Sequence, residues 1–291
     1  MSRIAVLADV HGNLPALEAV LADLDAQHVD EVLVGGDLVG RGPQGSAVVQ
    51  RVLGLGWRSV KGNHEDYLLD FRHGRVPEDW LSLASQEWAA ARWMAAELGP
   101  GEAEAIAALP FSLTAASHPD LRLVHGTPRS ANEGIGPWTP EAELARHLGE
   151  IAEPLLVCAH THRPLLRRLP QGTVVNVGSV GLPFNRDRRA QYAIFEEGAG
   201  EWQVEFRQVS YDLGSVVEVY QRTGFLAAGG VTARLLLLEL EHASPVLVPF
   251  LKWAEALQVP ARLERLEEFL AFHDPEEPLS RFFARLEALA G

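Results

Sequence analysis

Eight side chains able to bind metal ions or move protons fall just after short apolar runs of the sequence. They combine carboxylates, an amide and imidazoles: Asp9, His11, Asp37, Asn63, His64, His125, His160 and His162. Such a mixed set suits Mn, Fe or Zn better than Ca or Mg, which prefer oxygen ligands alone, and better than structural Zn, which prefers thiolates. The pattern therefore predicts a transition-metal site, provided that the fold brings these runs to one edge.

Each of these residues has a simpler interpretation when it is taken alone. Asp9, Asp37 and Asn63 are residue types typical of the turns and helix N-caps that follow strands. The joint pattern argues otherwise, because five predicted strand ends each carry such a donor. His160 and His162 also alternate by two, so both can point to the same side of an extended chain. Metal binding accounts for all of them together.

Alternating strands and helices must position the first of these residues. Strand-like runs at 4–8, 31–34 and 57–60 alternate with helical spacing at 14–24, 45–53 and 65–71. This order is typical of an α/β sheet, in which ligands bind at the carboxyl ends of the strands. Two further segments, 79–98 and 102–109, are predicted to be helical and to overhang the sheet edge.

The later part of the chain has a different pattern. Strand-like runs dominate at 121–124, 155–158, 165–169, 173–177, 190–195 and 202–209. They predict a second sheet in which 165–169 and 173–177 pair as a hairpin. Helical spacing then returns, which predicts one domain over residues 1–211 and a mostly helical extension over 212–291.

The composition is that of a folded, acidic protein. Hydrophobic residues make up 47% and charged residues 22%, and 25 Lys plus Arg against 39 Asp plus Glu give a net charge of -14. Such a surface repels phosphate backbones and anionic lipids, so we expect no stable nucleic-acid binding and no membrane association. The lone Cys158 is expected to be reduced, and the first apolar run is too short for a signal peptide. We therefore expect a cytoplasmic protein.

The candidate residues also fall into five short motifs in a fixed order. The motifs read Asp9-Val10-His11, Gly36-Asp37, Gly62-Asn63-His64-Glu65, His125-Gly126 and Ala159-His160-Thr161-His162. This series resembles the calcineurin-like metallophosphoesterases, whose signature is D-x-H, G-D, G-N-H, a lone His and G-H-x-H. The resemblance implies a two-sheet α/β sandwich flanked by helices, here with a helical C-terminal extension. It also implies metal-dependent hydrolysis of a small phosphoester substrate.

The resemblance implies a role for each residue. One divalent metal would take Asp9, His11, Asp37 and His162, and a second would take Asp37, Asn63, His125 and His160. Asp37 would bridge the two ions, and a metal-bridging hydroxide would be the nucleophile. Mn is the expected metal, with Fe, Zn, Ni or Co as alternatives. His64 would protonate the leaving oxygen, held charged by a neighbouring carboxylate, and Arg41 would contact the phosphate oxygens.

Two departures from the family pattern bear on the activity. The segment from Gly36 to Gly42 looks like the branch that holds Ser/Thr phosphatases and diadenosine tetraphosphatases, but Gly40 replaces the Asp that precedes their Arg. Ala159 replaces the usual Gly before His160. Phosphodiester hydrolysis is therefore the expected activity, with a phosphomonoesterase acting on phosphoprotein or nucleotides, or a dinucleoside tetraphosphate hydrolase, as alternatives. A metal-binding interaction scaffold is the non-enzyme alternative, disfavoured because every motif position is filled.

The helices expected beyond residue 212 carry apolar faces that must be buried. We expect them to pack against the sandwich or against a second copy, so a homo-oligomer is one alternative, and to shape substrate access rather than the metal centre. Trp88 is expected to pack in the core or in a lid rather than to stack on a base.

Overall fold

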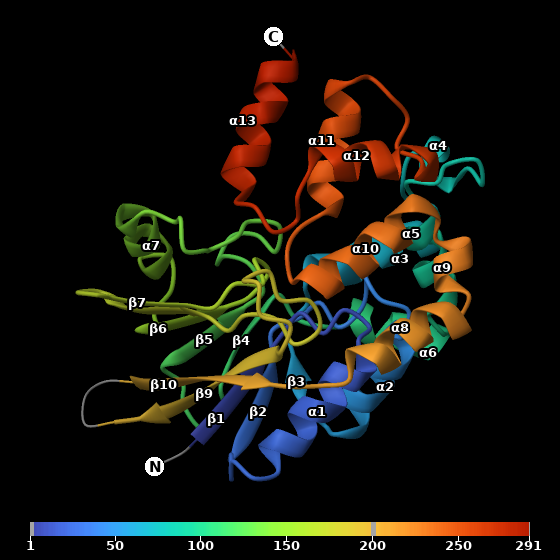
Figure 1. The fold of residues 1–291 in the computed structure, drawn as a ribbon. Helices are drawn as coiled ribbons and strands as arrows, with labels where there is room; N and C mark the ends of the chain where they lie inside the picture. Colours follow the sequence, from blue (N-terminus) through green and yellow to red (C-terminus); the bar gives the residue numbers. More distant parts are fainter. Residues whose placement is uncertain (1–2, 199–201, 291) are drawn as a thin grey trace.

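Two mixed five-stranded sheets face each other in the computed structural model, which describes residues 3–198 and 202–290 (Figure 1). The first sheet has the order β10-β9-β1-β2-β3 and the second the order β4-β5-β6-β8-β7. The strands of the first sheet are β1 (Arg3–Leu7), β2 (Glu31–Val34), β3 (Arg58–Ser59), β9 (Ala190–Glu197) and β10 (Trp202–Val209). Those of the second are β4 (Ser112–Thr114), β5 (Leu121–Val124), β6 (Leu155–Cys158), β7 (Leu165–Leu169) and β8 (Gly172–Asn176).

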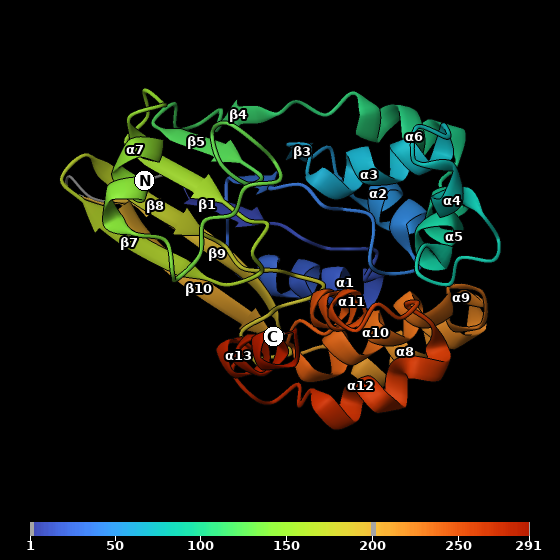
Figure 2. The same ribbon diagram turned by 90° about the horizontal axis from the view of Figure 1, so that it is seen from above.

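Helices cover the outer faces of both sheets (Figures 1 and 2). The first part of the chain forms α1 (Leu14–Leu24), α2 (Gly45–Gly54), α3 (Asn63–Arg72), α4 (Glu78–Leu81), α5 (Ala89–Glu97) and α6 (Pro100–Ala107). Helix α7 (Glu141–Leu148) covers the second sheet. The C-terminal part forms α8 (Leu213–Arg222), α9 (Phe225–Ala228), α10 (Gly230–His242), α11 (Leu247–Ala256), a 3₁₀ turn (Leu263–Arg265), α12 (Leu266–Phe272) and α13 (Leu279–Ala290). No helix of the described residues combines the length and apolar character that crossing a bilayer requires.

Strand β1 is apolar at successive positions because both of its faces are buried. Ala5 and Leu7 pack against the helices, whereas Ile4 and Val6 pack between the two sheets. All four side chains are fully buried. A strand with both faces buried reads as a continuous apolar run rather than an alternating one. The same rigid strand holds the residues that follow it at the sheet edge.

The predicted sandwich of two sheets is confirmed, and so is the β7–β8 hairpin, in which Leu166 pairs with Val175. The placement of the last two strands was wrong. Strands β9 and β10 belong to the first sheet, where Phe195 of β9 pairs antiparallel with Ile4 of β1. The apolar pattern identified these strands but did not specify their partner, since β9 is buried on both faces and suits either sheet.

The single helix expected over 79–98 was also wrong. Helix α4 ends at Leu81, and α5 begins only at Ala89. The guanidinium of Arg92 donates to the backbone carbonyls of Trp80 and Ser85, and the indole rings of Trp80 and Trp88 stack with centroids 3.9 Å apart. These contacts fold the intervening turn back on itself, so tertiary packing overrides the local helical spacing. Strand β4 and helix α7 were not predicted.

The C-terminal helices pack in two layers. Val216 and Tyr220 of α8 are buried in the same core as the helices that cover the first sheet. Helices α11 to α13 form a separate apolar cluster against α10, with Phe250, Phe269 and Phe282 fully buried at its centre. Figure 1 shows α11, α12 and α13 together above α10, at the end of the molecule away from α1. The domain boundary at residue 212 stays a prediction.

Candidate metal centre

The candidate residues converge where parallel strands end. Asp9 follows β1, Asp37 follows β2 and Asn63 follows β3, and these three strands are neighbours in the first sheet. His125 follows β5 and His160 follows β6, which are parallel neighbours in the second sheet. Because the two sheets face each other, both sets of strand ends meet at one edge. The seven predicted metal ligands all lie in this cluster: Asp9, His11, Asp37, Asn63, His125, His160 and His162.

The first group of donors surrounds His11. The Nε2 atoms of His11 and His162 lie 3.0 Å apart, and the His11 Nε2 lies 3.6 Å from the Oδ2 of Asp37. The Oδ1 of Asp9 lies 3.8 Å from the His162 Nε2. Two imidazole nitrogens and two carboxylate oxygens thus face one small volume, which matches the set expected for the first metal.

The second group shares Asp37 with the first. The Oδ1 of Asn63 lies 2.9 Å from the Nδ1 of His160 and 3.0 Å from the Nε2 of His125. The His125 Nε2 lies 3.3 Å from the Oδ2 of Asp37. The same carboxylate oxygen, Asp37 Oδ2, therefore faces both groups, as a bridging ligand must.

The hydrogen bonds around these side chains fit a cation in each group. The Nδ1 atoms of His11, His125 and His162 lie 3.1, 2.7 and 2.5 Å from the backbone carbonyls of Val39, Gly35 and Leu182. A carbonyl only accepts, so each Nδ1 must carry a hydrogen and each Nε2 faces the cluster. The buried Oδ1 of Asp9 accepts no hydrogen bond from the described residues. Lone pairs that face one another in a buried site match the needs of divalent metal ions.

Strained backbone holds the cluster in place. Ten described non-glycine residues have a positive φ. Five of them belong to the motifs, namely Asp9, His11, Asp37, His160 and His162, and a sixth is Arg41. Left-handed conformations are costly for such residues and persist only where the surroundings impose them. Here the backbone N–H groups of Asp9 and His11 donate to the carbonyls of Gly36 and Asp37, at 3.0 and 2.9 Å. The strain concentrates in the residues that would bind metal.

Glu65 has a role that the sequence did not reveal. Its buried carboxylate accepts the backbone N–H groups of Asp37, Leu38, Val39 and Gly62 at 2.9, 2.7, 3.4 and 2.7 Å. Burial and then the adjacent Asp37 raise the pKa of Glu65 to about 7. Its position three residues after the N-cap of α3, as in a capping box, was the available signal. Glu65 therefore ties the loop after β2 to the start of α3.

Steric contacts explain the glycine kept at position 62 and the alanine tolerated at position 159. A Cβ at Gly62 would lie 2.1 Å from the Oδ1 of Asp37, so only glycine fits before Asn63. By contrast, the methyl group of Ala159 is accommodated between the sheets, in contact with the apolar cluster there. The departure at Ala159 leaves His160 and His162, which follow it, in the donor cluster.

His64 lies beside the metal cluster, but its surroundings differ from those predicted. Its backbone N–H donates to the Oδ1 of Asp37 at 2.8 Å, while its ring Nε2 lies 3.3 Å from the Nε of Arg41. No carboxylate among the described residues hydrogen-bonds the ring, and the buried Nδ1 has no partner. A Cβ at Gly40 would lie 2.4 Å from that Nδ1, so Gly40 occupies the place where a carboxylate would approach. The predicted carboxylate that holds His64 charged was therefore wrong.

Burial and neighbouring charges shift the pKa values of the cluster residues in different directions. Burial would raise the pKa of Asp37, but His125 and then His64 bring it well below its usual range. Burial would lower the pKa of His125, but Asp37 and then Asp9 raise it to about 10. Burial lowers the pKa of His64 to about 3, so this ring is neutral at physiological pH. The carboxylates thus favour positive charge on the side of the cluster away from Arg41.

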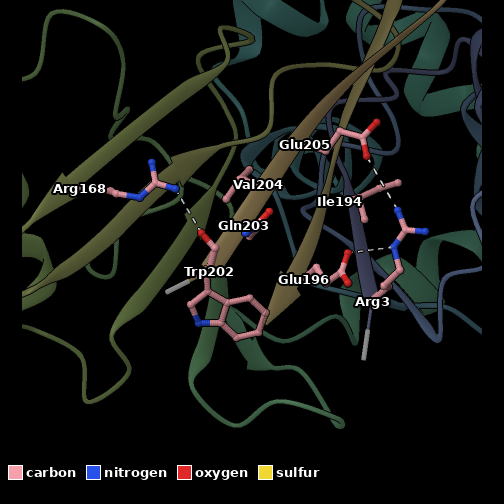
Figure 3. A pocket seen from close by; sticks show the side chains of 8 residues that line it. All are labelled: Arg3, Arg168, Ile194, Glu196, Trp202, Gln203, Val204 and Glu205. Atoms are coloured by element: carbon pink, nitrogen blue, oxygen red, sulfur yellow. Dashed lines mark hydrogen bonds and ion pairs between the residues drawn. The ribbon is translucent and has the colours of Figure 1, made fainter. Parts of the chain in front are cut away.

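A cavity of about 220 Å³ opens beside the cluster, and Arg41, Asn63 and His64 form part of its wall. A different cavity, of about 300 Å³, lies along β10 (Figure 3). Its Arg3 begins β1, whereas Asp9 follows the end of that strand, so this cavity lies at the opposite end of the sheet from the donors. Arg3 is already paired with Glu196 at 3.6 Å (Figure 3). The cavity beside His64 is thus the one that belongs to the site.

Comparison with known proteins identifies the class. The calcineurin-like phosphoesterase superfamily domain matches residues 2–200, which include every predicted site residue. The chain therefore belongs to this superfamily, as the motifs predicted. A metallophosphoesterase from Sphaerobacter thermophilus is 30% identical, with 83% of this chain and 99% of that chain covered and a TM-score of 0.67.

Two further relatives differ in the share of this chain that they match. A protein of Methanocaldococcus jannaschii, described as uncharacterized, is 25% identical over 75% of this chain and 91% of its own length. A symmetrical bis(5'-nucleosyl)-tetraphosphatase of Yersinia enterocolitica is 47% identical, but over only 22% of this chain and 23% of that protein. The second similarity is thus confined to a short segment.

Proposed function

We propose that this protein hydrolyses phosphodiesters at a centre of two divalent metal ions, with Mn as the preferred metal. The observation that carries the proposal is the position of the Asp37 Oδ2, which faces His11 Nε2 at 3.6 Å on one side and His125 Nε2 at 3.3 Å on the other. Membership of the phosphoesterase superfamily supports a hydrolase, and the candidate groups of His and Asp donors support metal binding.

The residues of the chain would divide the chemistry between them. One group of donors would hold each ion: Asp9, His11, Asp37 and His162 for the first, and Asp37, Asn63, His125 and His160 for the second. When bound, the two ions lower the pKa of a water molecule and neutralise charge on the phosphate. The Nδ1 contacts to backbone carbonyls fix the orientation of three of the imidazole rings. Asn63 supplies a neutral oxygen, which limits the total negative charge.

His64 and Arg41 would act on the other side of the phosphate. The proposal assigns the His64 ring to neither metal, although one of its nitrogens lies within 4.8 Å of donor atoms of His11 and Asp37. Its Nε2 now accepts from Arg41, so a proton transferred to the leaving oxygen must come from a protonated His64 or through water. Arg41 lies within reach of the same position and would contact the phosphate oxygens.

A dinucleoside tetraphosphatase is the second candidate. It is favoured by the short segment of 47% identity to the Yersinia enzyme. It is disfavoured by Gly40, which stands where that branch carries an Asp. A non-catalytic scaffold has less support, because all donors remain and lie together.

Parallel rate measurements test the proposal. Mn-loaded protein should hydrolyse bis(p-nitrophenyl) phosphate with a higher kcat/KM than p-nitrophenyl phosphate or diadenosine tetraphosphate. A preference for the tetraphosphate would favour the second candidate, and a preference for the monoester would replace diester hydrolysis with monoester hydrolysis. No turnover of any of the three with any of the five candidate metals would contradict the enzyme function.

A further inference from the structure

The cavity beside His64 has walls of an unusual composition for a phosphate site. Tyr67 and Trp88 contribute aromatic rings, and Met94, Leu236, Leu247 and Leu251 contribute apolar side chains. The Trp88 ring is held by stacking on Trp80, with centroids 3.9 Å apart. A phosphate group gains nothing from such walls, whereas an apolar ring attached to it would be buried.

The cavity is continuous with the proposed catalytic residues. Arg41, Asn63 and His64 belong to its wall, and the ring of Tyr67 packs edge-on against His64 with centroids 5.7 Å apart. A group that enters the cavity is therefore attached to a phosphate at the metal centre through the oxygen nearest His64. This is the position of the leaving alcohol in the proposed reaction.

The volume of the cavity and the charge of its wall limit which chemical groups can bind there. The cavity has a volume of about 220 Å³, and an apolar cavity of about 150 Å³ is enough to bind benzene. Glu87 is part of the wall and would repel a second anionic group, while it would accept a hydrogen bond from a ring that carries an amino group. A single flat, uncharged aromatic ring satisfies both conditions.

We propose that this cavity binds the leaving alcohol of the substrate and that this alcohol carries a flat, uncharged aromatic ring, inserted between Trp88 and the leucines of α10 and α11. The proposal rests on the phosphoesterase function proposed above. It makes the C-terminal helices part of the substrate site, because Leu236, Leu247 and Leu251 lie beyond the residues 2–200 that match the superfamily.

Binding of two phosphonates that differ only in the ring tests this proposal without turnover. Calorimetry on Mn-loaded protein should give phenylphosphonate a Kd about tenfold or more below that of methylphosphonate, because burial of a ring contributes at least that much. Leu251→Trp fills the cavity and should bring the two Kd values close together. Leu270→Trp is the matched control, since Leu270 is a similarly half-buried leucine in the same C-terminal cluster, outside the cavity wall. It should keep the preference for the ring.

A second variant guards against misfolding. Leu247→Phe fills the same wall with a smaller change and should also reduce the preference. Equal affinity for the two phosphonates in the unmodified protein would overturn the proposal, and so would a full preference in folded Leu251→Trp and Leu247→Phe. If neither phosphonate binds while bis(p-nitrophenyl) phosphate is hydrolysed, the cavity proposal alone fails. If neither binds and no substrate is hydrolysed, the proposed function fails with it.

Discussion

Arg41 donates from its Nη1 to the Oε2 of Glu239 at 2.9 Å, which joins the loop after β2 to helix α10. The Glu239 carboxylate is almost fully buried, and its other oxygen accepts the backbone N–H groups of Val246 and Leu247 at 2.9 and 3.0 Å. Glu239 therefore holds Arg41 next to His64, although Glu239 and Arg41 are 198 positions apart in the sequence. It also fixes the start of α11, which forms part of the cavity wall.

Glu239→Gln should separate the positioning role from the structural one. The amide oxygen still accepts the N–H groups of Val246 and Leu247, but the charge that holds Arg41 is lost. We expect kcat/KM to fall by about tenfold, with the metal content unchanged. Glu239→Ala should in addition destabilise the fold by about 3 kcal/mol, because it leaves the largely buried Arg41 unpaired. Metal analysis, kinetics and urea unfolding of both variants check this, and equal kinetics for Glu239→Gln and the unmodified protein would contradict it.

Removal of divalent metal should abolish hydrolysis and lower the thermal stability. The donors of the cluster are buried with their lone pairs facing one another, so without cations the folded state bears their repulsion. Dialysis against a chelator should abolish activity and lower the Tm, and subsequent addition of Mn should restore both. Activity that survives complete removal of metal would exclude the proposed mechanism.

Asp37→Ala and Asn63→Ala should differ in metal content. The Asp37 Oδ2 faces both donor groups, whereas Asn63 Oδ1 contacts only His125 and His160. We expect Asp37→Ala to lose both ions and Asn63→Ala to retain much of the first. Elemental analysis of the two purified variants measures this. Equal losses would refute the bridging position of Asp37.

His64→Ala should reduce turnover by roughly 100-fold while the metal content stays near that of the unmodified protein. The reason is that the proposal assigns His64 to neither metal and places it beside the cavity. A ring nitrogen of His64 also lies within 4.8 Å of donor atoms of His11 and Asp37, so loss of metal in this variant would instead make His64 a ligand. The reduction should be smaller for p-nitrophenyl esters, whose leaving group barely needs a proton, than for alkyl esters. A penalty that does not depend on the leaving group would show that His64 stabilises charge without acting as the acid.

Glu65→Ala should disturb two loops at once. It removes the acceptor for the N–H groups of Asp37, Leu38, Val39 and Gly62, which are buried and would lose their partner. Each unsatisfied buried donor costs about 1–3 kcal/mol, so we expect a destabilisation of at least about 3 kcal/mol and weaker metal binding. Chemical unfolding and metal titration check this. Glu18→Ala, at an exposed surface pair, is the control and should change neither.

The sequence was most informative where local periodicity and burial agree. Helix 14–24 and the strands 31–34, 121–124 and 155–158 have the predicted bounds, because each has a single apolar period between clear turn signals. The convergence of the candidate donors was also predicted, since strand ends bring their residues to one edge of a sheet.

The rest depended on contacts between distant residues. The apolar pattern of β9 did not determine its pairing with β1, and the Trp80–Trp88 stack that breaks the predicted helix is a tertiary contact. Arg41 was predicted to contact the phosphate, but its link to Glu239 leaves no signal in a single sequence, because Glu239 is distant in the chain and carries no motif. Gly40 was recognised as a departure from the family pattern, but its close approach to the His64 Nδ1 depends on the backbone conformation, with a φ of 79°.

The cavity wall has two origins in the chain. The superfamily domain supplies Asn63 and His64 and also part of the apolar wall, with Trp88 and Met94, whereas the helices that follow supply the remaining leucines, such as Leu236 and Leu251. If the cavity binds the leaving alcohol as proposed, chemistry and selectivity can diverge independently during evolution. Exchange of the C-terminal helices between relatives would give enzymes that share one reaction and differ in the alcohols they release.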